Sequence, residues 1–396
     1  MITETVQPAA AVEAGSVADV RAAVIRAVEQ DLPIAVRSTG HGSLVPPDGA
    51  MLISTSRMRG VQIDPRQRTA RVRPGARWSD VIAAAEPYGL APMSGDNPSV
   101  GVVGYTFGGG VGWLARRYGY GADNLLRAEL VSADGELLQT SAEERPDLFW
   151  AIRGGGGNFG VATELEVGLA PVSRVFAGTA YVPIERAAEA LQWFGEHAAE
   201  LPSGCTVAPR LLHRSPLPGR DGPILAVGLV QIVDDHTDVD SALRRLAPMI
   251  GDRVADDFAI TGYSEIAVPG CRPLGFEMYR ELPEKLIKVA VDSVIADEGA
   301  AALEFRHWGG ATAEPAPGAG PVGHRQIPFS IKIDGPPDVV SALAELATGT
   351  SFLNFLGDPG RTRTAYRVRD FYRLREIKRR YDPDNRFRVN HNIAPA

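Results

Sequence analysis

The sequence predicts an α+β protein, and three observations lead to this fold class. The chain has 396 residues, 44% of them hydrophobic and 22% charged, a composition ordinary for a folded enzyme of about two or three domains. The 43 glycines gather in three clusters at positions 40–42, 95–121 and 154–160. After Pro171, long strand-like runs alternate with helical stretches, which is typical of an antiparallel sheet covered by helices.

Charge and cysteine content exclude several classes of protein. Forty-one basic and 48 acidic residues give a net charge of −7, which argues against a nucleic-acid or anionic-membrane partner. Cys205 and Cys271 are too few for a disulfide framework or a CxxC zinc site, so no metal is expected. Positions 1–16 lack the apolar core of a signal peptide, and no run reaches the ~20 apolar residues of a membrane span. We therefore expect a cytoplasmic protein.

The elements of the first 170 residues follow from local signals. Ser16 caps a helix whose apolar face carries Val17, Val20, Val24, Ala27 and Val28. A strand at 34–37 runs directly into a Ser-Thr-Gly-His-Gly-Ser turn. Asp134-Gly135 between two alternating runs predicts a β-hairpin. The further strands are expected at 51–54, 61–63, 69–73, 127–132, 136–140 and 161–167, and short helices at 79–86 and 147–153.

The remainder of the chain has longer elements. Strands are expected at 175–182, 206–212, 225–233 and 329–333, and helices at 184–201, 236–250, 336–348 and 365–381. The last helix stops at Asp382-Pro383, because proline does not continue a helix. The Pro- and Gly-rich stretch 314–323 predicts a surface loop.

One glycine string imitates a dinucleotide-binding motif. Residues 155–160 read Gly-Gly-Gly-Asn-Phe-Gly and match G-x-G-x-x-G. That motif requires a strand before the glycines and a helix after them, so that the helix N-terminus meets the pyrophosphate. Here a helix is expected before the string and a strand after it. The order argues against a Rossmann-type NAD site.

His41 differs from four other histidines that stand alone in apolar or loop context, namely His197, His213, His236 and His307. It lies between Gly40 and Gly42, directly after Arg37-Ser38-Thr39. Glycines at a strand-to-turn junction let backbone amides converge into an anion-binding nest that suits a pyrophosphate. We therefore interpret the His41 imidazole as a candidate covalent attachment point for a cofactor.

Several runs along the chain together resemble one known family. They are Arg37–Gly42, Gly95–Gly101, Gly104–Gly110, Tyr120–Asn124, Leu148–Gly160 and Arg379–Ile393, with Glu304–Gly310 and His324-Arg325 between them. In this order they closely resemble the berberine-bridge-enzyme-like FAD-linked oxidases of the vanillyl-alcohol-oxidase superfamily. The likeness extends over nearly the whole chain.

The resemblance implies a two-part FAD-binding domain with an inserted α+β substrate domain. The implied limits are 1–172 for the first FAD-binding segment, 173–355 for the substrate domain and 356–396 for the C-terminal FAD-binding segment. In such enzymes the histidine that matches His41 carries the flavin 8α-methyl group. Many members add a cysteine tether, but Asn97 stands at that position, and Cys205 and Cys271 do not match it. A single histidyl link is therefore expected.

The resemblance also implies which residues contact the FAD. They are Arg37, Ser38, Thr39, Gly40, His41, Gly42, Ser43, Gly95, Asp96, Asn97, Val100, Gly101, Gly104, Tyr105, Gly108, Gly110, Gly112, Val161, Asn390 and Asn392. Asn97 has an equally weighted alternative, in which its side chain only shapes the turn before Pro98.

Relatives often carry a Tyr-x-Asn motif whose tyrosine acts as an acid or base. The matching stretch here is Phe352-Leu353-Asn354, and phenylalanine cannot exchange a proton. The catalytic group is thus unassigned, and the polar candidates are Tyr105, Tyr263, Tyr279 and His391.

The function that the resemblance implies is oxidation of a small organic substrate, and secondary metabolism is the expected setting. The substrate would give a hydride to flavin N5, and dioxygen would reoxidise the flavin to yield hydrogen peroxide. One alternative is a flavin-dependent cyclase or isomerase without net oxidation, which Phe352 favours. Another is a binding protein in which FAD is structural.

Overall fold

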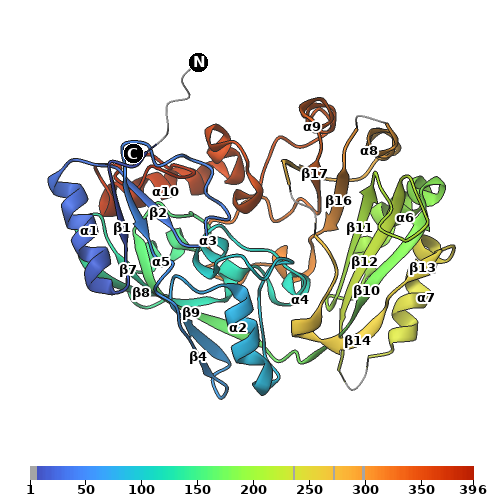
Figure 1. Ribbon diagram of the computed structural model, residues 1–396, viewed down its shortest axis with the longest axis horizontal. Helices are drawn as coiled ribbons and strands as arrows, with labels where there is room; N and C mark the ends of the chain where they lie inside the picture. The colour runs from blue at the N-terminus through green and yellow to red at the C-terminus, as the bar shows by residue number, and fades with distance from the viewer. Residues whose placement is uncertain (1–6, 235–236, 271–272, 297–298) are drawn as a thin grey trace.

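A computed structural model describes residues 7–396 except 235–236, 271–272 and 297–298, so Cys271 and His236 lie outside the described residues. Figure 1 shows two lobes side by side. The first lobe contains strands β1–β9 with helices α1–α3, α5 and α10, and the second contains β10–β17 with α6–α9. The short helix α4 lies between them. The two ends of the chain thus belong to the same lobe.

The first lobe begins with a small parallel sheet, in the order β1 (Ala10–Glu13), β3 (Met51–Ser54) and β2 (Ile34–Arg37). Helix α1 (Val17–Glu29) starts at the expected cap, since Ser16 and Asp19 form a capping box. Its buried face differs from the predicted one, because Ala23 is buried and Val28 is 37% exposed. At about 100° per residue, Val28 lies roughly 80° around the helix from Val20, at the margin of the packed face.

The six-stranded sheet of the first lobe is antiparallel. Its order is β4 (Val61–Asp64), β5 (Thr69–Val72), β9 (Val161–Ala170), β7 (Leu125–Val131) and β8 (Leu137–Ser141), with β6 (Ala91–Pro92) also paired to β9. The predicted hairpin is confirmed, because Val131 pairs with Leu137 across Asp134-Gly135. Helix α5 (Pro146–Ile152) precedes residues 155–160 and β9 follows them. This order is the reverse of the Rossmann arrangement.

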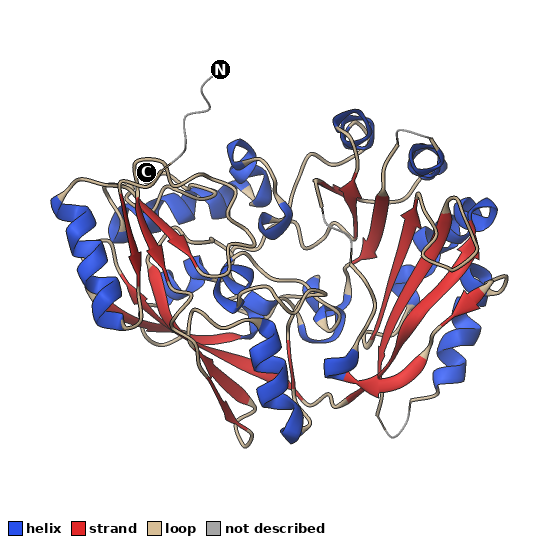
Figure 2. Ribbon diagram, in the orientation of Figure 1, coloured by secondary structure: helices blue, strands red, loops and turns tan. Residues whose placement is uncertain are grey.

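The second lobe is an eight-stranded antiparallel sheet with helices on its outer face (Figure 2). Its order is β13 (Ala255–Asp256), β10 (Arg174–Pro183), β12 (Ile224–Ile232), β11 (Cys205–Leu212), β16 (Ala302–His307), β17 (Phe329–Asp334) and β15 (Gly275–Tyr279), with β14 (Ala259–Gly262) paired to β10. The largest apolar cluster lies between this sheet and α6 (Ala187–His197), α7 (Val239–Ile250), α8 (Glu284–Ile295) and α9 (Pro337–Ala344). The predicted antiparallel sheet covered by helices is confirmed.

The other face of this sheet is turned toward the first lobe. The remaining helices are α2 (Trp78–Ala85), α3 (Val102–Phe107), α4 (Ala115–Tyr118) and α10 (Val368–Tyr381). The helices predicted at 184–201, 336–348 and 365–381 are too long. In the structure, short 3₁₀ turns or loops flank the α-helical part of each.

Candidate active site

The structure brings the three glycine clusters together in the first lobe. The loop after β2 contacts the second cluster, because a Cβ on Gly101 would lie 3.2 Å from the Thr39 side chain. Gly101 immediately precedes α3, and at the other end of α3 the Phe107 carbonyl accepts a hydrogen bond from Gly156 N at 2.9 Å. Residues 38–43 therefore lie at the start of α3, and residues 154–160 lie at its end.

Asn354 joins this helix to the end of the second lobe. Its Oδ1 accepts a hydrogen bond from Gly110 N at 2.8 Å, and its Nδ2 donates to the Tyr105 carbonyl at 3.2 Å. A Cβ on Gly108 would lie 2.4 Å from Asn354 Nδ2. Only glycine permits this approach at position 108, which gives Gly108 a packing role in addition to the predicted one.

The C-terminal segment closes the site from the side of the third cluster. Asn390 Nδ2 donates to the Gly157 carbonyl at 3.1 Å, and Asn158 Nδ2 donates to the His391 carbonyl at 3.0 Å. The His391 ring shares a hydrogen bond of 2.7 Å, through Nε2, with the Leu356 carbonyl. The segment that precedes the second lobe and the segment that follows it therefore contact each other at this site.

Four buried polar atoms, two in α3 and two in the C-terminal segment, indicate that this region binds a polar group. The Tyr105 hydroxyl, Thr106 Oγ1 and the Oδ1 atoms of Asn390 and Asn392 have no hydrogen-bond partner among the described residues. A buried polar group without a partner costs about 1–3 kcal/mol. Beside them Gly104 is exposed, and a Cβ there would meet nothing within 4 Å. Unpaired polar atoms next to open backbone fit the flavin cofactor that the sequence resemblance implies.

The candidate tyrosines divide into two groups. Tyr105 and Tyr263 are both buried, and Tyr263 shares a hydrogen bond of 2.8 Å with Ser94 Oγ. Burial raises the pKa of Tyr263 to about 12 and that of Tyr105 well above its usual value, so both stay protonated at neutral pH. Tyr279 donates its hydroxyl hydrogen to the Leu343 carbonyl at the C-terminal end of α9. This contact places Tyr279 on the helix-covered face, away from the other candidates.

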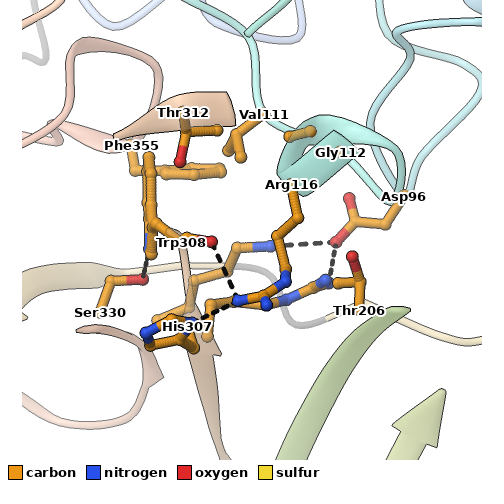
Figure 3. A pocket seen from close by; sticks show the side chains of 13 residues that line it. Asp96, Val111, Gly112, Arg116, Thr206, His307, Trp308, Thr312, Ser330 and Phe355 are labelled. Carbon is orange, nitrogen blue, oxygen red and sulfur yellow. Dashed lines mark hydrogen bonds and ion pairs between the residues drawn. The ribbon is translucent and has the colours of Figure 1, made fainter. Parts of the chain in front are cut away.

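A buried cluster of four charges connects the two lobes, as Figure 3 shows in part. Asp96 Oδ2 lies 3.0 Å from Lys332 Nζ and 3.4 Å from Arg306 Nη2. Glu304 Oε1 lies 3.1 Å from Lys332 Nζ and 2.7 Å from Arg306 Nε. Asp96 belongs to the first lobe, whereas the other three lie on neighbouring strands β16 and β17. We call these four residues the charge cluster.

The charge cluster is fully ionised at neutral pH. Burial alone would raise the pKa of Asp96, but Lys332 and Arg306 outweigh burial and lower the pKa to about 2. The same two cations keep the pKa of buried Glu304 below its usual value, and the two carboxylates raise the pKa of Lys332. Two positive and two negative charges neutralise each other here, which makes the cluster a structural junction and a poor proton donor or acceptor.

A cavity of about 30 Å³ adjoins the charge cluster (Figure 3). Apolar groups of Val111, Ala115, Trp308 and Phe355 form part of its wall. The volume suffices for about one or two water molecules. The cavity lies at the contact between the lobes.

Arg116 and His307 form a second buried polar pair at this cavity. Arg116 donates from Nη1 to His307 Nδ1 and from Nη2 to the Leu201 carbonyl at 2.8 Å. Burial, with a smaller contribution from the Arg116 charge, lowers the pKa of His307 to about 4. His307 is therefore neutral in the folded protein at pH 7.

The depressed pKa of His307 predicts a loss of stability in mild acid. Between pH 6.5 and 4 the unfolded chain binds a proton at this residue that the folded chain excludes. The free energy of unfolding should therefore fall by about 3 kcal/mol as the pH drops through this window. Chemical denaturation of the wild type and of His307→Asn, measured from pH 7 to pH 4, checks this. The variant should show a shallower decline, and an equal decline in both proteins would contradict the assignment.

The structure brings together most of the residues predicted from the sequence. Tyr105 lies in α3, and Asn390, His391 and Asn392 follow one another in the C-terminal segment, while Val161 is fully buried in the sheet opposite Val131. Asp96 directs its carboxylate to the charge cluster. Sequence reasoning missed Lys332 and Asn354 as contacts between the lobes. Lys332 could have been noticed in the sequence, because it is a charged residue within the apolar strand predicted at 329–333.

Two family models match segments of this chain. A model of the FAD binding domain matches residues 8–141, and a model described as berberine and berberine like matches residues 349–394. None of the helices in the described part of the chain is both long and apolar enough to cross a bilayer.

Similar proteins include several named as oxidases or as FAD-linked oxidoreductases. (R)-6-hydroxynicotine oxidase of Paenarthrobacter nicotinovorans is 30% identical over 423 aligned positions, covering 96% of this chain and 90% of that protein. Xylooligosaccharide oxidase of Thermothelomyces thermophilus is 36% identical, but over only 39% of this chain and 32% of that protein. The crystal structure of 6-hydroxy-D-nicotine oxidase from Arthrobacter nicotinovorans superposes with a TM-score of 0.84 at 26% identity, covering 98% and 92% of the two chains.

Proposed function

The chain belongs to the berberine-bridge-enzyme-like family of FAD-linked oxidoreductases, and from this premise we propose that it oxidises a small organic amine. His41 would hold FAD covalently, and the cofactor would supply hydride acceptance from the substrate and reoxidation by dioxygen to give hydrogen peroxide. The proposed FAD-binding segments are 1–172 and 356–396, with the substrate domain at 173–355. His41 is exposed in the loop after β2, which makes its imidazole accessible for the covalent bond.

The environment of Phe352 is the main support for an amine as the substrate. Its ring is 3% exposed and packs against Trp308 at 4.9 Å and Tyr120 at 5.5 Å between ring centres. No proton can be exchanged at this side chain. Oxidation of an alcohol requires removal of its hydroxyl proton as the carbonyl forms, a step that a general base assists. A neutral amine instead stabilises the cation left by hydride loss with its own nitrogen lone pair.

The other polar groups favour the same substrate class. Tyr105 and Tyr263 have raised pKa values and serve as hydrogen-bond donors. Lys332 is held charged between two carboxylates. Burial lowers the pKa of His391, so its ring is neutral, and Nδ1 can accept a hydrogen bond if Nε2 donates to Leu356. Tyr105, Tyr263 and His391 can orient a substrate and exclude water, and a neutral amine needs no further base.

The comparisons support an amine more strongly than a sugar. The nicotine oxidase relative aligns over almost the whole chain, including the second lobe, whereas the xylooligosaccharide oxidase aligns over 39% of it. Because the substrate domain shapes the pocket, similarity over that domain is the better guide to the substrate class. A redox-neutral cyclase or isomerase is the second candidate, and it too is compatible with Phe352.

Anaerobic mixing with matched amines and alcohols tests the proposal. We expect cyclic or secondary amines to bleach the flavin absorption, and readmitted air to restore it with formation of hydrogen peroxide. Bleaching by alcohols alone would refute the amine class. Conversion of a substrate without hydrogen peroxide or any demand for an electron acceptor would instead identify the cyclase or isomerase.

Asn97 is expected to shape a turn instead of contacting the flavin. Its Oδ1 accepts hydrogen bonds from Ser99 N at 2.9 Å and Ser99 Oγ at 2.7 Å, and the residue is exposed. Asn97→Ala should therefore leave the flavin absorption spectrum unchanged while lowering the free energy of unfolding by about 1 kcal/mol. Visible absorption and denaturant titration measure the two effects.

Ser99→Ala provides the matched control, since it removes part of the same turn from the other side. It should reproduce the small loss of stability with an unchanged spectrum. A spectral shift in Asn97→Ala but not in Ser99→Ala would show that the amide touches the flavin. Asn97→Cys tests the family alignment separately, because a thiol at the usual tether position should form a second covalent bond to the flavin.

A further inference from the structure

A larger cleft lies outside the candidate active site, between helices α5 and α10 of the first lobe and the loop that precedes β17. It has a volume of about 530 Å³, within the range of small-molecule sites. One wall is the N-terminal part of α10, another is α5, and the loop 315–320 forms a third. None of the lining residues belongs to the predicted flavin-binding set.

The lining of this cleft is strongly basic although the whole chain is acidic. Its charged residues are Arg153, Arg325, Arg367, Arg369, Arg373 and Asp370. Two arginines have carboxylate partners: Arg325 lies 2.6 Å from Asp123, and Arg369 lies 3.8 Å from Asp370. The other three, Arg153, Arg367 and Arg373, have no carboxylate within 4.0 Å among the described residues. Like charges that share a cleft repel one another, and a bound anion would relieve this repulsion.

Aromatic rings hold two of these guanidinium groups in place. Arg373 stacks at 3.9 Å from the ring centre of Trp150, and Arg153 at 4.9 Å from that of Phe149. Phe149 and Trp150 are consecutive residues of α5. Because stacking fixes the planar groups before a ligand arrives, less conformational entropy is lost on binding.

The loop opposite is pressed against Arg153 and carries no competing charge. Residues 315–320 read Pro-Ala-Pro-Gly-Ala-Gly. A Cβ on Gly320 would lie 2.1 Å from the Arg153 carbonyl oxygen, so glycine is required for this close approach. Arg153 donates its Nε hydrogen to the Ala122 carbonyl at 3.1 Å, which leaves its two Nη groups for a ligand.

We propose that this cleft binds a small organic polyanion bearing phosphate or carboxylate groups. Three guanidinium groups without carboxylate partners supply paired N–H donors that match either oxyanion. The cleft's size admits a metabolite-sized ligand. The proposal is independent of the substrate class argued above.

Isothermal titration of the flavin-loaded protein with pyrophosphate and, separately, with citrate tests this proposal. At least one probe should bind saturably, and which of them binds distinguishes phosphate from carboxylate ligands. Arg373→Gln should weaken binding about tenfold or more, because a hydrogen bond to a charged group contributes about 1.5–3 kcal/mol. Trp150 lies under Arg373, so tryptophan fluorescence supplies a second readout.

Arg380→Gln is the control variant, because it makes the same charge change on the same helix. Arg380 pairs with Asp147 at 2.8 Å and does not line the cleft, so binding should stay within about twofold of the wild type. Equal weakening of anion binding by both variants would show that only the net charge of the protein matters. That result, or the absence of saturable binding of both probes, would overturn the proposal.

Discussion

Replacing His41 with alanine is expected to leave the protein folded but with flavin that acid precipitation releases. The wild type should stay yellow under the same treatment. The reason is that the His41 loop is held by its neighbours: Ser38 Oγ donates to the Pro74 carbonyl at 2.7 Å, and Thr39 packs against Gly101. Substrate oxidation should slow by about tenfold or more, since each 1.36 kcal/mol added to the barrier costs that factor.

Mass spectrometry of the peptide that contains His41 measures the bond directly. His213→Ala is a suitable control, because His213 contacts the Val294 carbonyl in the second lobe through Nδ1 and should retain acid-stable flavin. An unmodified His41 peptide in flavin-loaded wild type would refute the covalent link. Insoluble His41→Ala protein would instead make His41 a residue required for folding.

Lys378→Met is expected to lower the free energy of unfolding by about 3–5 kcal/mol, because it leaves the buried Asp382 carboxylate without its cation. Both side chains are 0% exposed, and Lys378 Nζ lies 2.6 Å from Asp382 Oδ2. Nζ also donates to the Asn158 carbonyl at 2.7 Å and the Phe387 carbonyl at 3.2 Å. The lysine therefore ties α10 to the third glycine cluster.

Lys288→Met is the matched control for this prediction. Lys288 pairs with Asp292 at the same 2.6 Å, but the two side chains are 73% and 61% exposed. Solvent screens such a pair, so the loss should be about 0.5 kcal/mol or less. Urea titration of both variants gives the comparison, and equal losses would contradict a special role for the buried pair. Lys378→Met should also lower the fraction of the protein that incorporates flavin, since Asn158 contacts both the Gly155 and the His391 carbonyls.

Local patterns predicted the elements that local chemistry controls. The cap at Ser16, the hairpin at Asp134-Gly135 and most strands were predicted correctly, because turn residues and alternation act over a few positions. The strand at 275–279 and the helix at 284–295 were not identified. The strand is buried at nearly every position and so lacks alternation, whereas Leu286, Ile287, Ala290 and Val294 follow the helical period and the helix could have been predicted.

The contacts between the lobes could not be predicted from local patterns. Asp96 and Lys332 are separated by 236 positions, and nothing in either neighbourhood names the other as its partner. The candidate flavin residues were grouped by the family resemblance, whereas the unpaired oxygens of Asn390 and Asn392 became visible only in the folded chain. Phe352 was noticed as an isolated departure, and its enclosure by aromatic rings required the tertiary structure.

The charge cluster has a consequence for enzyme engineering. Substrate preference in such a protein would most simply be changed by exchanging the second lobe for that of a relative. If the donor lobe has no cations at these two places, such a chimaera would keep Asp96 without Arg306 and Lys332, which neutralise it. The stranded carboxylate would destabilise the hybrid by several kcal/mol even if both halves were sound. A chimaera should therefore take the residue at position 96 from the same protein as the second lobe.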